Sequence, residues 1–560
     1  MIFAISSNRV GLKFNRLVAF ILPVLLALVS ADRAAPAAPA FPLYFIDARD
    51  DASLPALSPS DIEVLATNFV FGHFGMQGCS PEVVRAFHAL NPHFIALRYV
   101  SHQRTDYTLK PSNAESHRMD LLYYRCAALS APIAKETTEF KLNEVGGPIA
   151  LKASTIQADS TDSIDPTHKF VTWIRIENEL MRLEGWDPLT KTVRVKRGFD
   201  GTTAMAYPAK ANVLAPVATA TFSRQSTAVD AKELTVRYSY DPARARRWEL
   251  SLQSALENQK DGFDGTWYDL ISATPFRPAD INQSPLNNVW DCVRQHNYTP
   301  DDYRLACEKG LHYVMTNYFA SQGRWPIIFI NNMKRTEYYP EKGAIQNFLK
   351  STPEKPRPVD GYCVEVYGGS ISKEDFEQSV KSGQTVKLNY VHEEIWKSNV
   401  SVFMDAAQNG LAAVPYNAMA GRENRAFEHL DAQARNRFDL WAYATYLMAV
   451  ERKSGKCPTV FGINPFYWEG NQRKAILNSR YTWDLGDPIE SRSPDHLDQY
   501  KSANHQTYVR KFQKGIVLVN PSTVKDEGVP LGRDYVDQET EQKVTAVSLA
   551  PQTGRILLIP

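Results

Sequence analysis

The chain has 560 residues, of which 44% are hydrophobic and 22% are charged, and its formal net charge is +1. This composition supplies a large apolar core and excludes an intrinsically disordered chain. The balanced charge gives no basis for nucleic-acid binding, which needs a basic face. The length exceeds one ordinary domain, although a barrel with insertions can absorb most of it.

The first forty residues predict an export signal. Basic residues precede the apolar run LVAFILPVLLALVS, and small residues at its end have the spacing of a cleavage site. The run is short for a membrane span, so a retained anchor is the less favoured alternative. We predict a signal peptide over 1–31, a Pro/Ala linker over 32–42, and a secreted protein, extracellular or periplasmic, with no membrane span in the mature chain.

From residue 43 onward, β-rich runs alternate with amphipathic helical stretches, which predicts a mostly parallel sheet covered by helices. Eight candidate strands fit an α/β fold of the (β/α)8 TIM-barrel type over 43–146 and 218–500. A doubly wound open sheet is the alternative, but no Gly-rich phosphate turn follows an early strand. The candidate strands lie within 62–74, 93–101, 234–241, 263–272, 325–332, 359–369, 410–419 and 457–468.

Two segments depart from this alternation of strands and helices. Residues 147–217 show strand-like alternation and Asp-Pro turns, which predicts a small β-domain inserted into a barrel loop. In it, Gly198 and Gly201 of the pentapeptide GFDGT are expected to form a turn, and the glutamates are expected to be solvated strand residues. Residues 501–560 are short strands joined by turns, which predicts a C-terminal β-sandwich domain.

The six cysteines show no CxxC or metal-ligand spacing, and the histidines are scattered. The sequence therefore predicts no metal and no cofactor. Cys292 and Cys307 flank a polar loop and are the one candidate disulfide, which the even cysteine count of an exported protein permits.

Two predicted strands carry carboxylates toward their C-terminal ends. FDGTWYDLIS contains Asp269, and GYCVEVYGG contains Glu365. A carboxylate in so apolar a strand costs free energy unless it is paired or lies in a cleft. Two of them at one barrel rim are the groups that glycoside hydrolysis needs, one as proton donor and one as nucleophile or cation stabiliser. Asp264 and Asp360 precede a glycine where each strand begins, so we expect them to be structural residues at the opposite face.

Other polar and aromatic residues lie at predicted strand ends, where barrel enzymes bind substrate. Each could equally be packing within the barrel. The candidates for binding sugar hydroxyls are Arg98, Tyr99, Tyr240, Asn331, Asn332, Tyr416, Asn417, Tyr467 and Trp468.

The series GFDGTWYDLIS, INN, DGYCVEVYGG and a β-rich C-terminal tail resembles a glycosyl-hydrolase-like TIM-barrel family related to endo-α-1,4-polygalactosaminidases and α-galactosidases. The resemblance covers roughly residues 62–130 and 234–560. It implies that Asp269, at the end of a GFDG-containing fourth strand, is catalytic, and that Glu365 is the acidic residue of a later strand. The inserted segment is similar to a β-module of phage tail proteins, with Tyr207 in place of its usual His.

These observations predict a secreted glycoside hydrolase that cleaves a poly- or oligosaccharide with an Asp269/Glu365 pair. Retention and α-linked substrates are what the resemblance implies. The alternative is a non-catalytic carbohydrate-binding or cell-surface protein on a barrel scaffold. In both cases the expected partner is a carbohydrate and not nucleic acid, and the oligomeric state stays open.

Overall fold

The structure is a computed structural model of the chain. It describes residues 39–47, 57–75, 79–101, 104–108, 118–143, 173–216, 218–225, 232–269, 300–330, 361–364, 369–370, 389–408, 412–415, 432–452, 459–463, 465–469, 472–489, 493 and 496–560.

The central element is an eight-stranded sheet in which every described pairing is parallel. Strands that follow one another in the chain lie side by side, and the last strand pairs with the first. This is the strand order of a (β/α)8 barrel. The strands at the two ends of this order are β18 (Ala412–Pro415) and β19 (Phe461–Ile463), and they have Cα atoms within 8 Å of one another. The eight strands are β1 (Leu43–Asp47), β2 (Phe71–Phe74), β3 (Ile95–Ser101), β13 (Gly265–Asp269), β14 (Ile327–Ile330), β15 (Gly361–Val364), β18 (Ala412–Pro415) and β19 (Phe461–Ile463).

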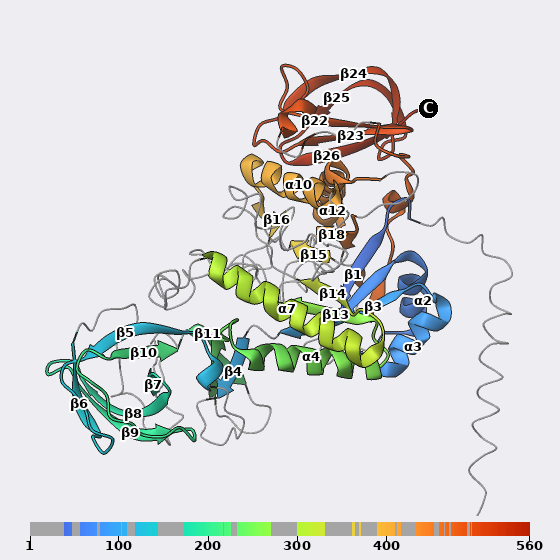
Figure 1. The fold of residues 1–560 in the computed structure, drawn as a ribbon. Coiled ribbons are helices and arrows are strands. Elements are labelled where there is room, and N and C mark those ends of the chain that lie inside the picture. Colours follow the sequence, from blue (N-terminus) through green and yellow to red (C-terminus); the bar gives the residue numbers. More distant parts are fainter. Residues whose placement is uncertain are drawn as a thin grey trace, which may run out of the picture.

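Helices cover the outside of this sheet, as Figure 1 shows. A capping box begins the first one: the Ser58 hydroxyl accepts from the Asp61 amide, and the Asp61 carboxylate accepts from the Ser58 amide. Residues 59–68 are therefore helical, although we expected the run over 62–74 to be β throughout. The helices are α2 (Pro59–Asn68), α3 (Pro81–Leu90), α4 (Ala245–Lys260), α7 (Pro300–Gln322), α10 (Glu393–Gln408) and α12 (Ala432–Ala449).

The candidate strand over 234–241 does not belong to the eight-stranded sheet. β12 (Lys232–Ser239) pairs antiparallel with β11 (Ala218–Gln225) and β4 (Arg104–Thr108) in a separate sheet. β3 pairs directly with β13 instead, and β1, which lies between β19 and β2, is the eighth strand of the order. Alternating hydrophobicity predicts a strand but does not select its partner, and this is why the prediction failed here.

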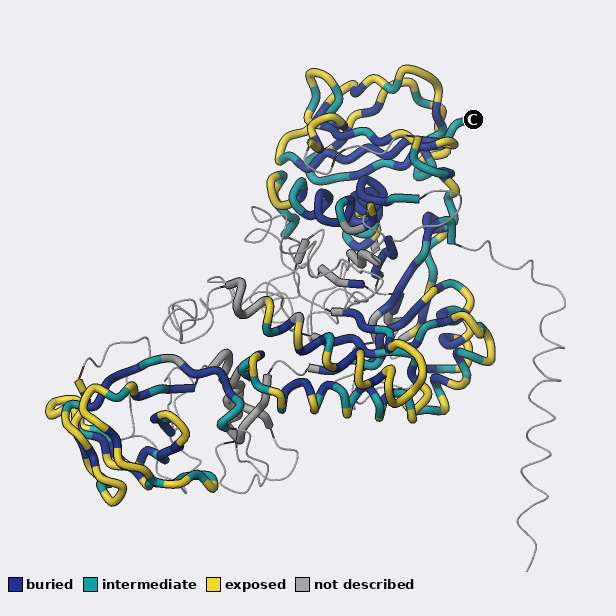
Figure 2. The backbone as a smooth tube through the Cα atoms, in the orientation of Figure 1, coloured by how far each residue is buried: buried dark blue, intermediate teal, exposed yellow. Residues whose placement is uncertain are grey.

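Apolar layers cover both faces of the eight-stranded sheet. Outward-facing residues of the strands pack with the helices in the main core, which contains Phe45, Phe87 and Trp441. Inward-facing residues form a smaller and mostly aromatic core that contains Tyr44 and Trp267. Figure 2 shows the buried strands between half-exposed helices.

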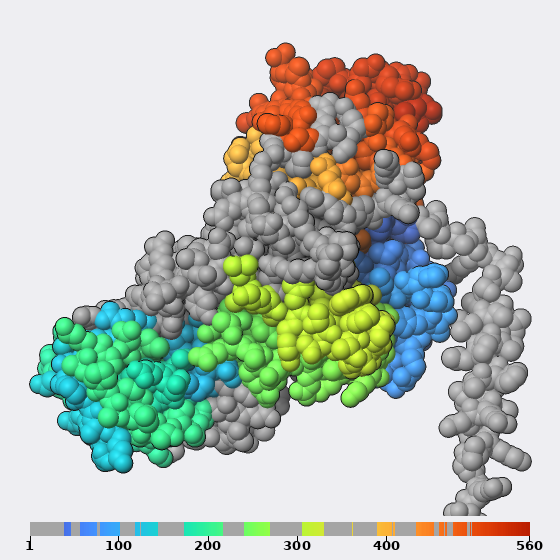
Figure 3. Space-filling model, in the orientation of Figure 1, coloured from blue at the N-terminus to red at the C-terminus, as the bar shows by residue number. Residues whose placement is uncertain are grey.

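The inserted domain is a closed six-stranded barrel with its own apolar core. It includes two strands within 123–143, so the domain begins before the predicted boundary at 147. In Figure 3 it lies at one end of the molecule. Its strands are β5 (Tyr123–Leu129), β6 (Glu139–Asn143), β7 (Trp173–Ile176), β8 (Glu179–Asp187), β9 (Thr192–Phe199) and β10 (Asn212–Pro216).

One glutamate of the inserted domain, Glu179, is fully buried and not solvated as expected. Its two carboxylate oxygens accept from Arg197 Nε at 2.7 Å and Nη2 at 2.8 Å, and from the amides of Gly198 and Met205 at 3.0 Å. Burial by itself raises the pKa of Glu179, but these hydrogen bonds outweigh it and lower the pKa below its ordinary value. Such a fully bonded pair holds the end of β9.

The first copy of GFDGT forms the expected turn. Gly198 and Gly201 have φ values of +58° and +77°, in the left-handed region that favours glycine. In the second copy, Gly262 ends α4 with φ +90°. Gly265 lies inside β13, where an added Cβ would lie 2.3 Å from the Ile327 carbonyl oxygen. The two copies therefore serve different local structures.

The C-terminal domain is one antiparallel sheet of order β22-β23-β26-β24-β25, whereas we predicted a sandwich of two sheets. Register shifts in β24, together with Gly528 and Gly532 at positive φ, accompany its path above the other strands in Figure 1. One continuous sheet thus encloses a second apolar cluster. The strands are β22 (Tyr508–Phe512), β23 (Gly515–Asn520), β24 (Asp526–Asp537), β25 (Gln542–Leu549) and β26 (Thr553–Leu558).

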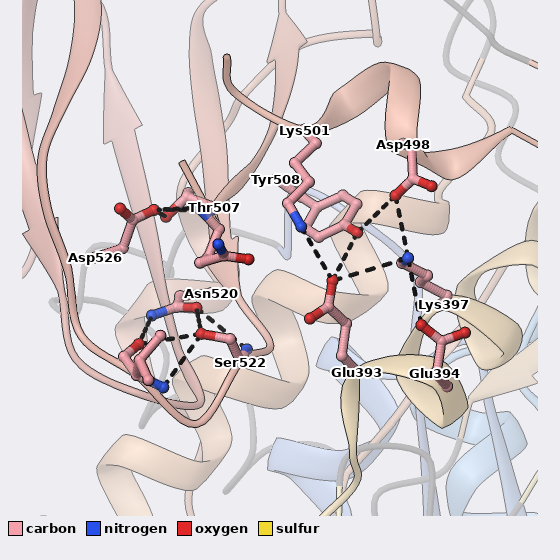
Figure 4. A network of polar contacts seen from close by, with 12 residues as sticks. Glu393, Glu394, Lys397, Asp498, Lys501, Thr507, Tyr508, Asn520, Ser522 and Asp526 are labelled. Carbon is pink, nitrogen blue, oxygen red and sulfur yellow. Dashed lines mark hydrogen bonds and ion pairs between the residues drawn. The ribbon is translucent and has the colours of Figure 1, made fainter. Parts of the chain in front are cut away.

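Buried polar groups attach this sheet to the barrel helices. Arg510 of β22 donates to the carbonyls of Leu447 and Met448 at the end of α12, at 3.2 and 2.7 Å. The Tyr508 hydroxyl lies 2.9 Å from Glu393 Oε1 of α10 and 2.8 Å from an Asp498 carboxylate oxygen (Figure 4). These contacts give hydrogen-bond partners to the last carbonyls of α12 and to the carboxylates of Glu393 and Asp498 at the domain boundary.

Short elements complete the described chain. They are the 3-10 helices η1 (Arg118–Asp120), η5 (Ser479–Thr482) and η6 (Leu497–Tyr500), and the strands β16 (Gly369–Ser370), β17 (Asn389–Tyr390), β20 (Phe466–Glu469) and β21 (Gln472–Ala475).

Candidate active site

The carboxyl ends of the parallel strands meet at one face of the sheet. β13 ends at Asp269, which is in register with Ser101 at the end of β3. β15 ends at Val364, directly before Glu365. β13 and β15 are separated only by β14, so their axes are about 10 Å apart. Glu365 itself lies outside the described residues, and of Asp269 the structure describes the backbone.

The barrel interior beneath this face is lined by aromatic rings. His73 of β2 stacks on Tyr99 of β3 with ring centroids 5.2 Å apart, and its centroid lies 4.8 Å from that of Trp267 of β13. Trp267 in turn stacks between Tyr44 and Phe329. Trp267 is two residues before Asp269 on the same strand, so this aromatic floor lies directly below the end of β13.

Two polar atoms of the floor, His73 Nδ1 and Trp267 Nε1, are buried without a hydrogen-bond partner among the described residues. His73 is only 4% exposed. Burial lowers its pKa from the ordinary value near 6.5 to about 3, so the imidazole is neutral at physiological pH. A neutral imidazole and an indole N–H can hydrogen-bond a hydroxyl, and leaving them unpaired costs about 1–3 kcal/mol each. The floor therefore has the capacity to bind a hydroxylated ligand or water.

The low pKa of His73 makes barrel stability depend on pH. Because the unfolded histidine binds a proton below about pH 6.5 and the folded one does not until about pH 3, stability is lost as pH falls through this window. Between pH 7 and pH 5 the loss is about 2 kcal/mol. We expect His73→Phe, which keeps an aromatic ring, to flatten this dependence. The measurement is the difference in Tm between pH 7 and pH 5; equal differences in the two proteins would contradict the assignment.

Two predicted sugar-binding residues lie elsewhere. Arg98 is on the outer face of β3, where its guanidinium lies 5.0 Å from the Phe263 ring centroid and donates to the Cys79 carbonyl at 3.3 Å. Tyr240 is buried in a cluster with Leu121, between the inserted domain and α4. The reason is the same in both cases: the strand pattern did not specify which face or which sheet the residue joins.

The other candidates divide into three groups. Tyr99 is an inward-facing residue of the floor, and its contact with sugar hydroxyls stays a prediction. Tyr467 and Trp468 belong to β20, which forms a hairpin with β21, and only their backbone is described. The candidates outside the described residues are Asn331, Asn332, Tyr416 and Asn417.

Asp264 is structural, as expected. At the start of β13 its carboxylate accepts from the Ala96 amide at 2.8 Å and contacts His88 Nε2 at 2.9 Å. It thereby joins β3, β13 and the end of α3 at the face opposite the rim. Asp360 lies outside the described residues.

Sequence reasoning missed His73. The signal was a histidine in the apolar run VFGHF, where an ionisable ring in a predicted strand core is unusual. The spacing that histidine metal ligands need does not reveal a single buried imidazole. Cys307 also differs from expectation: its thiol is buried in α7 and is not in a disulfide.

The described residues include no group of three metal-ligating side chains. Among the helices that the structure describes, none has the length and apolarity needed to cross a bilayer.

Comparisons with known proteins give weak similarities. The glycoside hydrolase domain of PelA from Pseudomonas aeruginosa is 10% identical with a TM-score of 0.27, over 71% of this chain and 91% of that chain. A trehalose-6-phosphate hydrolase of Bacillus licheniformis is 8% identical with a TM-score of 0.40, over 92% and 99%. A family GH13_31 enzyme is 8% identical with a TM-score of 0.40, over 93% and 99%.

With TM-scores below 0.5, these similarities establish neither the fold nor the activity of this chain. No protein-family model matches the sequence, and no curated protein is similar enough to count as a relative. The resemblance to the polygalactosaminidase-related family therefore stays a prediction.

Proposed function

We propose that the protein is a glycoside hydrolase that cleaves a poly- or oligosaccharide at the carboxyl ends of the barrel strands. The observation that carries the proposal is the placement of Asp269 at the end of β13, with the end of β15 next but one in the sheet and Glu365 directly after it. In barrel enzymes this face holds the catalytic groups. Asp269 acts as nucleophile or cation stabiliser, and Glu365 protonates the leaving oxygen.

The alternation of β13 supports this role. Thr266 and Tyr268 contact α4 on the outer face, through Asn258 and the Ser251 carbonyl, whereas Trp267 is inside the barrel. Side chains alternate along a strand, so the pattern of β13 predicts an inward-facing side chain at every second position from Trp267.

The proposal includes a complete (β/α)8 barrel. Seven strand junctions are hydrogen-bonded among the described residues, and at the eighth, β18 and β19 approach within 8 Å. Closure at that junction would bring both carboxylates to one enclosed mouth.

Retention of configuration on an α-linked substrate is the finer proposal, and it rests on the resemblance. Carboxyl groups about 5–5.5 Å apart support retention, whereas about 6.5–9.5 Å leave room for the water of an inverting enzyme. Proton NMR of the first product anomer distinguishes the two outcomes.

The first experiment is a screen of purified protein against neutral, acidic and amino polysaccharides, followed by release of reducing ends. Hydrolysis of one class supports the proposal. Binding without cleavage of any of them favours the alternative, a non-catalytic carbohydrate-binding protein on a barrel scaffold.

We further propose that the protein is exported and that residues 1–31 are removed. The support is the basic and apolar order of this segment. N-terminal sequencing of the protein recovered outside the cytoplasm should begin near residue 32; an intact Met1 there would contradict cleavage.

A further inference from the structure

The outer face of the inserted barrel carries more basic than acidic side chains, since only Glu139, Glu184 and Asp187 accompany its cations on the strands β6, β8 and β9. β9 lies between β6 and β8, and its exposed residues Arg194 and Lys196 alternate with the buried Val193 and Val195. Because β6 and β8 place further cations beside β9, a basic surface spans the three strands. We define the basic face as Lys141, Arg182, Arg194 and Lys196.

The cations of the basic face are not held in ion pairs with described residues, although Glu139, Glu184 and Asp187 lie on the same face. None of the four forms an ion pair within 4.0 Å with another described residue. Glu139 is opposite Arg194 in the register of β6 and β9, but it is not among the ion pairs. By contrast, Glu179 and Arg197 in the interior of the same domain are fully paired. The domain thus satisfies its buried charges and leaves those of the basic face available.

The register makes the basic face energetically unfavourable in isolation. Arg182 and Lys196 are directly opposite one another in β8 and β9. Like charges at opposite positions destabilise a sheet. A bound anion between Arg182 and Lys196 would remove this repulsion. A face that serves only solubility gains nothing from two cations at opposite positions.

The Arg194 guanidinium lies beside Gly185 of β8. The two residues are opposite one another, and a Cβ added to Gly185 would lie 2.8 Å from Arg194 Nε and 2.9 Å from Nη2. A side chain at position 185 would therefore displace the guanidinium from its present place. A planar guanidinium suits bidentate contact with carboxylates.

The position of the domain relates this face to the proposed hydrolysis. The chain leaves the carboxyl end of β3 for the inserted domain and returns through β12 to α4 and β13. The domain is thus inserted after the carboxyl end of β3, the strand that pairs with β13. A second binding surface on such an insertion raises the local concentration of a polymeric substrate at the rim.

We infer that the basic face binds a polysaccharide with carboxylate groups, an acidic polymer of the uronic-acid type. This inference rests on the proposed glycoside hydrolase function for the choice of a polysaccharide over other polyanions. Four cations against three carboxylates give this face a net positive charge, which complements a polymer that carries carboxylates along its length. Polymers with amino groups, which the polygalactosaminidase resemblance implies, would be repelled.

The test is binding of the full chain, with Asp269→Asn to prevent cleavage, to polygalacturonate by affinity electrophoresis. Arg194→Glu and Lys196→Glu should each weaken binding about tenfold. Gly185→Ala, which displaces the Arg194 guanidinium without changing charge, should give a smaller but measurable loss. Lys511→Glu in the exposed part of β22 is the matched control and should bind like the parent. Binding should also weaken between about 50 mM and about 300 mM salt.

Three results would overturn the inference: unchanged binding in both charge reversals, equal binding of fully methyl-esterified polygalacturonate, or tighter binding to duplex DNA or to chitosan. Circular dichroism of each variant separates loss of the face from loss of the fold. If only the hydrolase proposal is wrong, the protein binds polygalacturonate but cleaves no polysaccharide. This outcome differs from the three results above.

Discussion

Asp269→Asn and Glu365→Gln should each reduce kcat/KM for the cleaved glycan by about 10²–10⁴-fold, the usual cost of removing a positioned acid, base or nucleophile. The measurement is initial-rate hydrolysis of the polysaccharide that the screen identifies. For Glu365→Gln, a glycoside with a good leaving group should retain more activity, since that leaving oxygen needs no proton.

The matched control for this experiment is Asp264→Asn, the same change at the other end of β13. Asp264 contacts His88 and the Ala96 amide, away from the rim, so kcat/KM should stay near the parent value while Tm falls. Equal losses at Asp264 and Asp269 would indicate damage to the strand. Full activity in both rim variants would refute the assigned mechanism.

The second large effect is expected at Glu179 of the inserted barrel. Glu179→Gln leaves Arg197 buried without a full counter-charge, and breaking such a pair costs about 3–5 kcal/mol. Hydrogen exchange over residues 173–216 measures this locally. The exposed Glu184 of the same strand is the control, and Glu184→Gln should change stability by less than about 0.5 kcal/mol.

The pH dependence of this domain follows from the lowered pKa of Glu179. A carboxylate with a depressed folded pKa contributes stability that is present above its unfolded value and is lost as pH falls through the folded one. The parent should therefore lose protection on acidification below about pH 4, while Glu179→Gln should change less. Replacing both partners, as in Glu179→Gln with Arg197→Met, should cost less than the single change.

Some features follow from the sequence because they depend on local chemistry. The turn at Gly198 and Gly201 needs positive φ, which only glycine adopts at low cost. Asp264, before a glycine where a strand begins, is a structural residue as the Asp-Gly pair indicates. The end of β13 at Asp269 follows from the short apolar run before it.

The parallel order of the barrel strands also agrees with the alternation of helices and strands. The alternation of helices and strands repeats along the chain, so it can be predicted from the sequence without knowing which segments pack together.

Other features were decided by the tertiary structure alone. Period-two alternation predicts that β12 is a strand, but it pairs with β11 and β4 because their edges, and not that of β3, lie beside it. Arg98 and Tyr99 are adjacent in sequence, yet one faces the helices and the other the barrel interior. Glu179 is buried because Arg197 and two amides meet it from a distant strand end.

His73 has its low pKa for the same kind of reason, since strands far apart in the chain surround it with rings. Burial, ionisation and partner choice are properties of what surrounds a residue. The sequence specifies the residue at each position, whereas the packing of distant segments determines what surrounds that residue.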